Sequence, residues 1–275
     1  MEVGILIHMS KDVYGDIANM GHLGFTNGQL AIWDMSLYED DKIADIRRAC
    51  KDYNFTVTAV WCGWTGPIIW TYPQMYTTLG LVPGAWRAQR VNEILKGAAF
   101  ARKLGVKHII THLGFLPDDP SHPDRIGVVN AVRYICKQIE GYGQRFLFET
   151  GEELPITIVQ FMKEVGTDNM GINFDPANLL INGRANPQDA LDLLLPYIQG
   201  FHGKDGIYPT ITSPKGKEVL IGEGIVDFPA ILKKLLKAGY DGAITIEREV
   251  PYGAQRDCEL VKEKAYLEEI IRKLV

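Results

Sequence analysis

The chain has 275 residues, of which 46% are hydrophobic and 23% are charged, a composition typical of an ordered globular protein rather than a disordered one. Its 29 basic and 34 acidic side chains give a formal net charge of −5. Because nucleic-acid binding depends on basic surface, this balance disfavours a nucleic-acid partner, although the net charge does not exclude a local basic groove. No apolar run reaches the ~18–20 residues of a membrane span, so we expect no membrane partner.

The cysteine pattern points to a reducing compartment. Cys50, Cys62, Cys136 and Cys258 form no C-x-x-C pair and are too sparse for a disulfide scaffold. The segment Met1–His8 lacks the basic start and long apolar core of a signal peptide. Together these features predict a cytoplasmic protein.

Eight short apolar segments alternate along the chain with segments of helical periodicity. Most of them are rich in Ile, Val, Phe or Thr and show no polar alternation, which is typical of strands buried on both faces of a parallel sheet. The predicted strands are Val3–His8, Gln29–Asp34, Phe55–Trp61, Lys107–Leu113, Arg145–Thr150, Met170–Asp175, Ile198–His202 and Gly242–Glu247. The second of these shows the weakest pattern.

The segments between the strands repeat apolar residues at intervals of three and four, which predicts helices with one buried face. In one of them Val91, Ile94 and Ala98 share a face, and Gly105 follows as a stop signal. The predicted helices are Asp40–Tyr53, Arg87–Leu104, Val128–Tyr142, Ile156–Val165, Pro187–Leu195, Phe228–Ala238 and Asp257–Val275.

Strands alternating with helices from end to end predict an α/β fold, a single (β/α)8 TIM-barrel domain over residues 1–275. A doubly wound open sheet is the alternative. Two connections are unusually long, Cys62–Ala85 and Lys204–Asp227, and each follows a predicted strand. In a barrel both would lie at the C-terminal face, where active sites are built.

The last four predicted strands end in side chains that can bind a metal. Glu149, Asp175, His202 and Glu247 end the fifth, sixth, seventh and eighth strands. A buried carboxylate is costly unless it is paired or bound to a cation. We therefore expect one divalent cation, with Mn²⁺ as first choice and Co²⁺, Mg²⁺ or Zn²⁺ as alternatives. The competing explanation is that each acid only caps a helix or forms an ion pair.

Five segments make the chain resemble the xylose-isomerase-like TIM barrels, the sugar phosphate isomerase/epimerase superfamily that also holds endonuclease IV. They are Phe148–Gly151, Asn173–Leu179, His202–Asp205, Gly222–Pro229, and Gly239–Gly242 running to Glu247. The resemblance covers the chain from about Lys107 to Glu247. It implies that Glu149, Asp175, His202 and Glu247 hold the metal, and that Glu149 and Glu247 also move protons.

A pair of carboxylates beside a Lewis-acidic cation suits proton removal next to a carbonyl. Return of the proton to the same carbon from the opposite face gives epimerisation, and transfer to the neighbouring carbon gives aldose–ketose isomerisation. We therefore expect a metal-dependent isomerase or epimerase of a small carbohydrate, either a sugar, a sugar phosphate or a keto-polyol. Loss of a neighbouring leaving group gives the alternative, a dehydratase or lyase acting on an oxidised sugar or inosose.

Two other functions are less favoured. An endonuclease IV-like DNA phosphodiesterase is disfavoured because Asn178 stands where that enzyme and the ketohexose 3-epimerases normally carry His. Lys204 and Asp205 also replace the expected Asp-x-His pair. A non-catalytic sugar-binding barrel would not need Glu149 and Glu247 as an opposed pair.

Five further residues are predicted to contact the substrate: Trp61, His112, Glu153, Asn178 and Lys204. Lys204 would neutralise a substrate oxyanion or phosphate, unless it pairs with a nearby acid. His112 ends the fourth strand, where a hydrogen-bonded core histidine is the alternative. The tryptophans in and beside the first long connection would stack on a sugar ring, close a lid or form an oligomer contact. The sequence is therefore compatible with a homo-oligomer.

Overall fold

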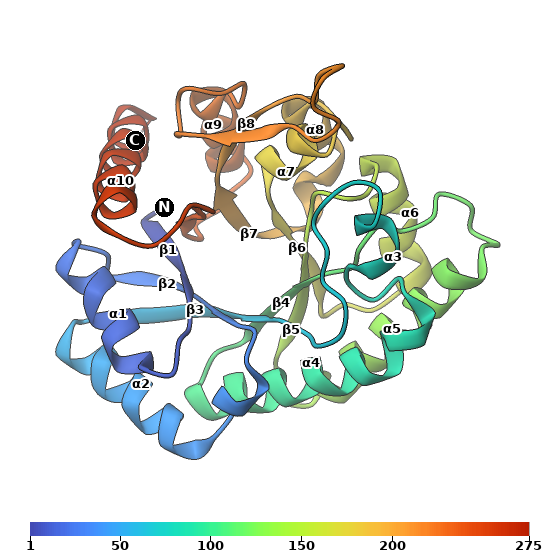
Figure 1. Cartoon of the computed structure of the whole chain (residues 1–275), viewed down its shortest axis with the longest axis horizontal. Coiled ribbons are helices and arrows are strands. Elements are labelled where there is room, and N and C mark those ends of the chain that lie inside the picture. Colours follow the sequence, from blue (N-terminus) through green and yellow to red (C-terminus); the bar gives the residue numbers. More distant parts are fainter. Residues whose placement is uncertain (275) are drawn as a thin grey trace.

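The structure, a computed structural model, describes residues 1–274. Eight parallel strands close into a barrel in the order β1-β10-β7-β6-β5-β4-β3-β2 (Figure 1), which confirms the predicted (β/α)8 barrel and excludes the open sheet. The barrel strands are β1 (Val3–His8), β2 (Asn27–Ile32), β3 (Thr56–Cys62), β4 (His108–His112), β5 (Arg145–Glu149), β6 (Met170–Phe174), β7 (Ile198–Gly203) and β10 (Ile244–Ile246).

Helices surround the barrel, and proline and glycine mark many of their ends. They are α1 (Val13–His22), α2 (Asp40–Asp52), α3 (Met75–Thr78), α4 (Gly84–Leu104), α5 (Pro123–Glu140), α6 (Pro155–Val165), α7 (Pro176–Ile181), α8 (Pro187–Leu194), α9 (Phe228–Lys237) and α10 (Ala254–Leu274), with 3₁₀ turns η1 (Met35–Leu37) and η2 (Leu195–Tyr197). Proline opens four of them because its missing N–H is not needed in a first turn. Gly105 ends α4 at φ 82°, a left-handed conformation that costs glycine little. Within residues 1–274, no helix is both long and apolar enough to cross a membrane.

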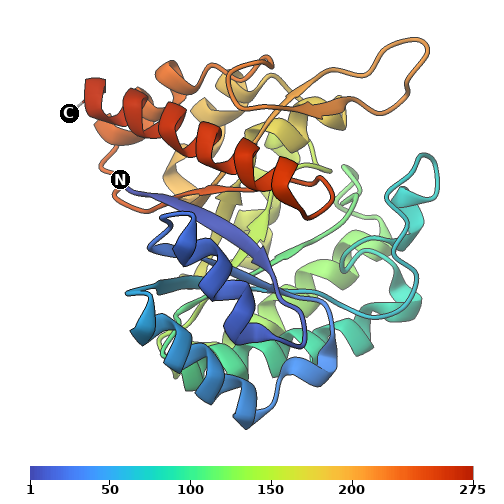
Figure 2. The same cartoon turned by 60° about the vertical axis from the view of Figure 1, so that its left-hand side comes forward.

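The predicted helices and strands lie within a few residues of the observed ones, but some elements were missed. The sequence patterns did not delimit α1, α3 or α7. The second long connection also contains an antiparallel hairpin, β8 (Asp205–Ile207) with β9 (Lys217–Val219). Figure 2 shows this hairpin and the segment around α3 extending from the barrel on the same side. The predicted end of the last helix, Val275, lies outside the described residues.

The two faces of β5 pack against different apolar side chains. Because side chains alternate along a strand, neighbours in β5 face opposite ways. Phe148 packs towards α6 with its ring centroid 5.9 Å from that of Phe161, and Leu147 joins an apolar cluster with Leu6 and Ile110. Glu149, next along β5, is also buried. Polar side chains at these strand ends are thereby held on a rigid apolar base.

Candidate functional site

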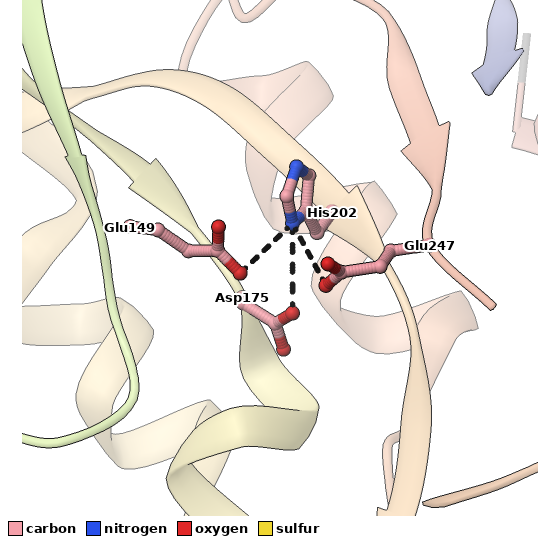
Figure 3. Close-up of side chains that lie close together, drawn as sticks. All are labelled: Glu149, Asp175, His202 and Glu247. Carbon is pink, nitrogen blue, oxygen red and sulfur yellow. Dashed lines mark hydrogen bonds and ion pairs between the residues drawn. The ribbon is translucent and has the colours of Figure 1, made fainter. Parts of the chain in front are cut away.

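The four predicted metal-binding side chains meet at the C-terminal ends of their strands (Figure 3). One ligand atom of each of Glu149, Asp175, His202 and Glu247 lies within 4.8 Å of the others, and all four residues are buried. The Nδ1 atom of His202 lies 3.1 Å from Glu149 Oε1, 3.2 Å from Glu247 Oε2 and 3.6 Å from Asp175 Oδ2. Three carboxylates therefore converge on one imidazole nitrogen.

The two carboxylate oxygens of Asp175 differ in their hydrogen bonding. Its Oδ1 accepts a hydrogen bond of 2.8 Å from the backbone N–H of Asn178, and so caps the N-terminus of α7. Its Oδ2 is buried and accepts no hydrogen bond from residues 1–274. Capping alone therefore does not account for this side chain, because a buried acceptor without a partner is costly.

Three predicted substrate contacts instead hold the carboxylates of the cluster. Trp61 Nε1 donates to Glu149 Oε2 over 2.6 Å, and Asn178 Nδ2 donates to Glu149 Oε1 over 3.0 Å. Lys204 Nζ donates to Glu247 Oε2 over 3.1 Å. Within the described chain, Glu247 Oε1 accepts no comparable hydrogen bond. The two glutamates therefore differ, because Glu149 has both oxygens occupied and Glu247 has only one.

Sequence reasoning missed Gln29, which orients His202 from β2. The Nε2 of Gln29 donates to Asn173 Oδ1 over 3.1 Å, so its Oε1 faces the Nε2 of His202 at 2.9 Å and accepts a hydrogen bond from it. This tautomer leaves Nδ1 to face the carboxylates. The available signal was a polar side chain directly before the apolar segment Leu30–Ile32. Such partners fix the ring of a metal-binding histidine.

The electrostatics of the cluster suit a cation. Burial raises the pKa of Asp175 to about 7. Burial acts to lower the pKa of His202, but Glu149 and Glu247 outweigh it and raise that pKa well above its ordinary value. Three buried carboxylates face one imidazole here, and a divalent cation would balance the remaining negative charge. The mixed oxygen and nitrogen donors fit Mn²⁺, Co²⁺, Mg²⁺ or Zn²⁺.

A cavity of about 460 Å³ lies beside the cluster, within the size range of small-molecule sites. His112, Asn178, Trp70 and Lys215 are among the residues that line it. Asn178 connects it to the cluster through Glu149. A larger cavity of about 630 Å³ lies at the opposite end of the barrel, where β4 and β7 begin, and is remote from this chemistry.

Two neighbouring acids after β5 point to different surroundings. Glu152 lines the cavity, and its Oε2 lies 3.2 Å from Nδ1 of His112. Glu153 is buried outside the cavity lining, and burial raises its pKa well above the ordinary value. The turn after β5 directs consecutive side chains apart, so the structure favours Glu152 over Glu153 as a substrate contact. Trp70 likewise lines the cavity, whereas Trp61 lies beneath it against Glu149.

Arg248 follows Glu247 and is enclosed by three carboxylates from two segments. Its guanidinium lies 2.5 Å from Glu218, 2.9 Å from Glu259 and 3.9 Å from Glu263. These contacts join β10 to the β8–β9 hairpin and to α10. They therefore fix the chain at the position where Glu247 enters the site.

Glu263→Gln is expected to remove a pH dependence of stability. Burial raises the pKa of Glu263 from 4.5 to about 7, so the folded chain binds an extra proton between these values. The free energy of unfolding therefore falls as pH rises through this window. Glutamine keeps an acceptor for the N–H of Ile221 without the charge, so the variant should gain about 2 kcal/mol at pH 8 and nothing near pH 4.5. Urea unfolding at both pH values measures this, and equal differences at the two would contradict it.

The sequence model of the xylose isomerase-like TIM barrels matches residues 17–270. The chain belongs to the xylose isomerase-like TIM barrel family. A family match over this span agrees with the closed barrel and with the cluster at its C-terminal end.

Several relatives show how far the likeness extends. A xylose isomerase domain protein from Planctomyces limnophilus is 29% identical with a TM-score of 0.93, over 99% of this chain and 98% of that one. A D-tagatose 3-epimerase-like protein is 20% identical with a TM-score of 0.78, over 100% and 98%. A probable 3-DHS dehydratase from Bacillus anthracis is 20% identical with a TM-score of 0.71, over 98% and 99%. The last two show the fold alone.

One curated relative matches a shorter segment. An uncharacterized protein of Methanocaldococcus jannaschii is 30% identical over 123 residues, which is 44% of this chain and 39% of that protein. The aligned segment thus spans well under half of that relative's length.

Proposed function

We propose that the chain is a divalent-metal-dependent isomerase or epimerase of a small carbohydrate. The observation that carries this proposal is the buried pair Glu149 and Glu247 on either side of His202, beside a cavity of about 460 Å³ (Figure 3). Membership of the family and the likeness to a D-tagatose 3-epimerase-like protein support a sugar substrate. We further propose Mn²⁺ as the metal, one domain over the whole chain and a cytoplasmic location.

Glu149, Asp175, His202 and Glu247 would hold the cation, which when bound supplies a Lewis acid for the substrate carbonyl. We assign proton removal to Glu247, because its Oε1 accepts no hydrogen bond from residues 1–274 while Lys204 holds Oε2. Glu149, fixed by Trp61 and Asn178, would donate a second proton from the opposite side, so that one carboxyl group loses a proton as the other gains one. Donation to the same carbon inverts it, and donation to the neighbouring carbon moves the carbonyl.

The first test is solvent exchange. The Mn²⁺-loaded protein is incubated in D₂O with ketoses, keto-polyols and their phosphates, and NMR follows deuterium uptake at carbons beside the carbonyl. Uptake that requires both the metal and Glu247 is the expected result, and product analysis then separates epimerase, isomerase and dehydratase. Binding of these sugars with no uptake in any of them would instead support a sugar-binding barrel.

Gln29→Leu is expected to weaken Mn²⁺ binding about 10- to 100-fold, because nothing then fixes the tautomer of His202. Gln29→Glu keeps an acceptor facing Nε2 of His202 and should lose less affinity. Calorimetric titration with Mn²⁺ measures both variants. An unchanged affinity in Gln29→Leu would mean that Gln29 only fills space inside the barrel.

A further inference from the structure

Carboxylates at the edge of the cavity have cationic partners. Glu152 faces His112, whose Nδ1 lies 3.2 Å from its Oε2. Glu249 faces Lys204, whose Nζ lies 3.1 Å from its Oε2. Both acids line the cavity, and neither needs a further cation to balance its charge.

Two basic side chains at this end of the barrel, Lys204 and Arg248, already contact carboxylates. Lys204 contacts Glu247 and Glu249, each over 3.1 Å, and Asn178 over 3.2 Å. Arg248 has the three carboxylates described above. The ammonium group of Lys204 therefore already has two carboxylate partners. This favours the alternative that Lys204 pairs with nearby acids over the prediction that it neutralises a substrate anion.

Lys215 differs from these residues. It lines the cavity from the loop between β8 and β9, and its Nζ donates to the backbone carbonyl of Trp70 over 3.3 Å. The same Nζ lies 5.9 Å from the centre of the Trp70 ring. Within the described part of the chain, no carboxylate oxygen lies within 4.0 Å of it. Lys215 is thus a cationic side chain that is partly buried at the cavity edge with no carboxylate in direct contact with it.

The surroundings of Lys215 disfavour its charged form. Burial lowers its pKa, and the nearby charge of Lys204 lowers it further, while Glu249 and Glu152 act in the opposite direction. None of the four cluster residues forms an ion pair with it. A group held by Lys215 would therefore lie on a part of the substrate away from the cluster.

We infer that Lys215 binds an anionic group of the substrate, a phosphate or a carboxylate, so that the chain prefers acidic sugars to neutral ones. The Trp70 carbonyl and ring hold the ammonium at the cavity edge. An anion would supply the partner that the protein itself lacks there. This inference rests on the proposed function for its substrate class, but not on which carbon loses the proton.

The test compares matched probes on the Mn²⁺-loaded full chain. D-Fructose 6-phosphate, 2-keto-D-gluconate and D-fructose are titrated calorimetrically into the wild type, Lys215→Met and Lys215→Arg. Lys217→Met, on the same hairpin but outside the cavity lining, is the control. We expect the wild type to bind an anionic probe at least about 10-fold more tightly than D-fructose, as a charge-assisted contact predicts. The two anionic probes distinguish phosphate from carboxylate.

In Lys215→Met this preference should fall about 10-fold or more with D-fructose affinity unchanged, and Lys215→Arg and Lys217→Met should retain it. No tighter binding of either anionic probe, or an equal loss for neutral and anionic probes, would overturn the inference. Deuterium uptake separates it from the proposed reaction. Uptake from neutral ketoses with no anion preference would leave the reaction standing alone, and anion preference with no uptake would leave the Lys215 site alone.

Discussion

Glu247→Gln is expected to slow metal-dependent deuterium uptake by about 10³-fold or more without unfolding the chain. Glutamine keeps an oxygen for the ammonium group of Lys204 but cannot accept a proton from carbon at neutral pH. Glu149→Gln should cause a comparable loss in product formation, because product forms only when a proton is also delivered to carbon.

Two measurements make this result specific. Uptake is followed by NMR at saturating Mn²⁺, so that a weaker metal site does not mimic a catalytic loss, and the thermal midpoint is compared with the wild type. Glu223→Gln, an exposed glutamate in a turn, is the matched control and should keep full activity. Uptake within about 10-fold of the wild type in both Glu247→Gln and Glu149→Gln would refute the two-carboxylate mechanism.

Asp175→Asn should have opposite effects on the protein with and without metal. Asparagine caps a helix as well as aspartate does, so α7 keeps its N-terminal hydrogen bond. Burial raises the pKa of Asp175 from 3.8 to about 7, so its charged form destabilises the metal-free fold as pH rises through this window. At pH 8 the metal-free variant should therefore melt about 5 °C higher than the wild type.

The same variant should lose stabilisation by the cation. A cation at about 100 times its dissociation constant adds roughly 2.7 kcal/mol, or about 5–10 °C for a chain of this size. We expect that increment in the wild type with Mn²⁺, its reversal by EDTA, and its loss in Asp175→Asn. Asp241→Asn, an exposed acid at the opposite end of the barrel, is the control. A wild type whose melting temperature does not respond to Mn²⁺, Co²⁺, Mg²⁺ or Zn²⁺ would rule out the metal centre.

The pattern of predicted strands was enough to predict most of the fold and the location of the cluster. Apolar segments of five to seven residues, each followed by a helical segment, predict a parallel barrel. In that barrel the residues that end β5, β6, β7 and β10 must share one rim. Glu149 and His202 are 53 residues apart in sequence, yet their positions at the ends of β5 and β7, which both pair with β6, bring them to 3.1 Å. Strand register decides such a contact, and register follows from hydrophobic patterning.

Loops and side-chain partners were much harder to predict. The segments that hold Trp70 and Lys215 are 145 residues apart and belong to no common sheet. No periodic pattern fixes how two such loops meet. The choice between Glu152 and Glu153 as a substrate contact was hard to predict for a similar reason, because one residue of rotation in a turn reverses which side chain faces the cavity. Gln29 was missed because its role depends on His202, which lies 173 residues further along the chain.

The sequence by itself determined the eight-stranded barrel, the two long connections and the four side chains that end its last strands. These features depend on hydrophobic periodicity and on the fixed direction of parallel strands, both of which are local properties of the chain. Only the tertiary structure decided which carboxylate oxygens accept hydrogen bonds, which histidine nitrogen faces the cluster, and that Lys215 rather than Lys204 has no carboxylate in direct contact with it. Those outcomes depend on contacts through space between distant segments, where a difference of about 1 Å separates a hydrogen bond from none.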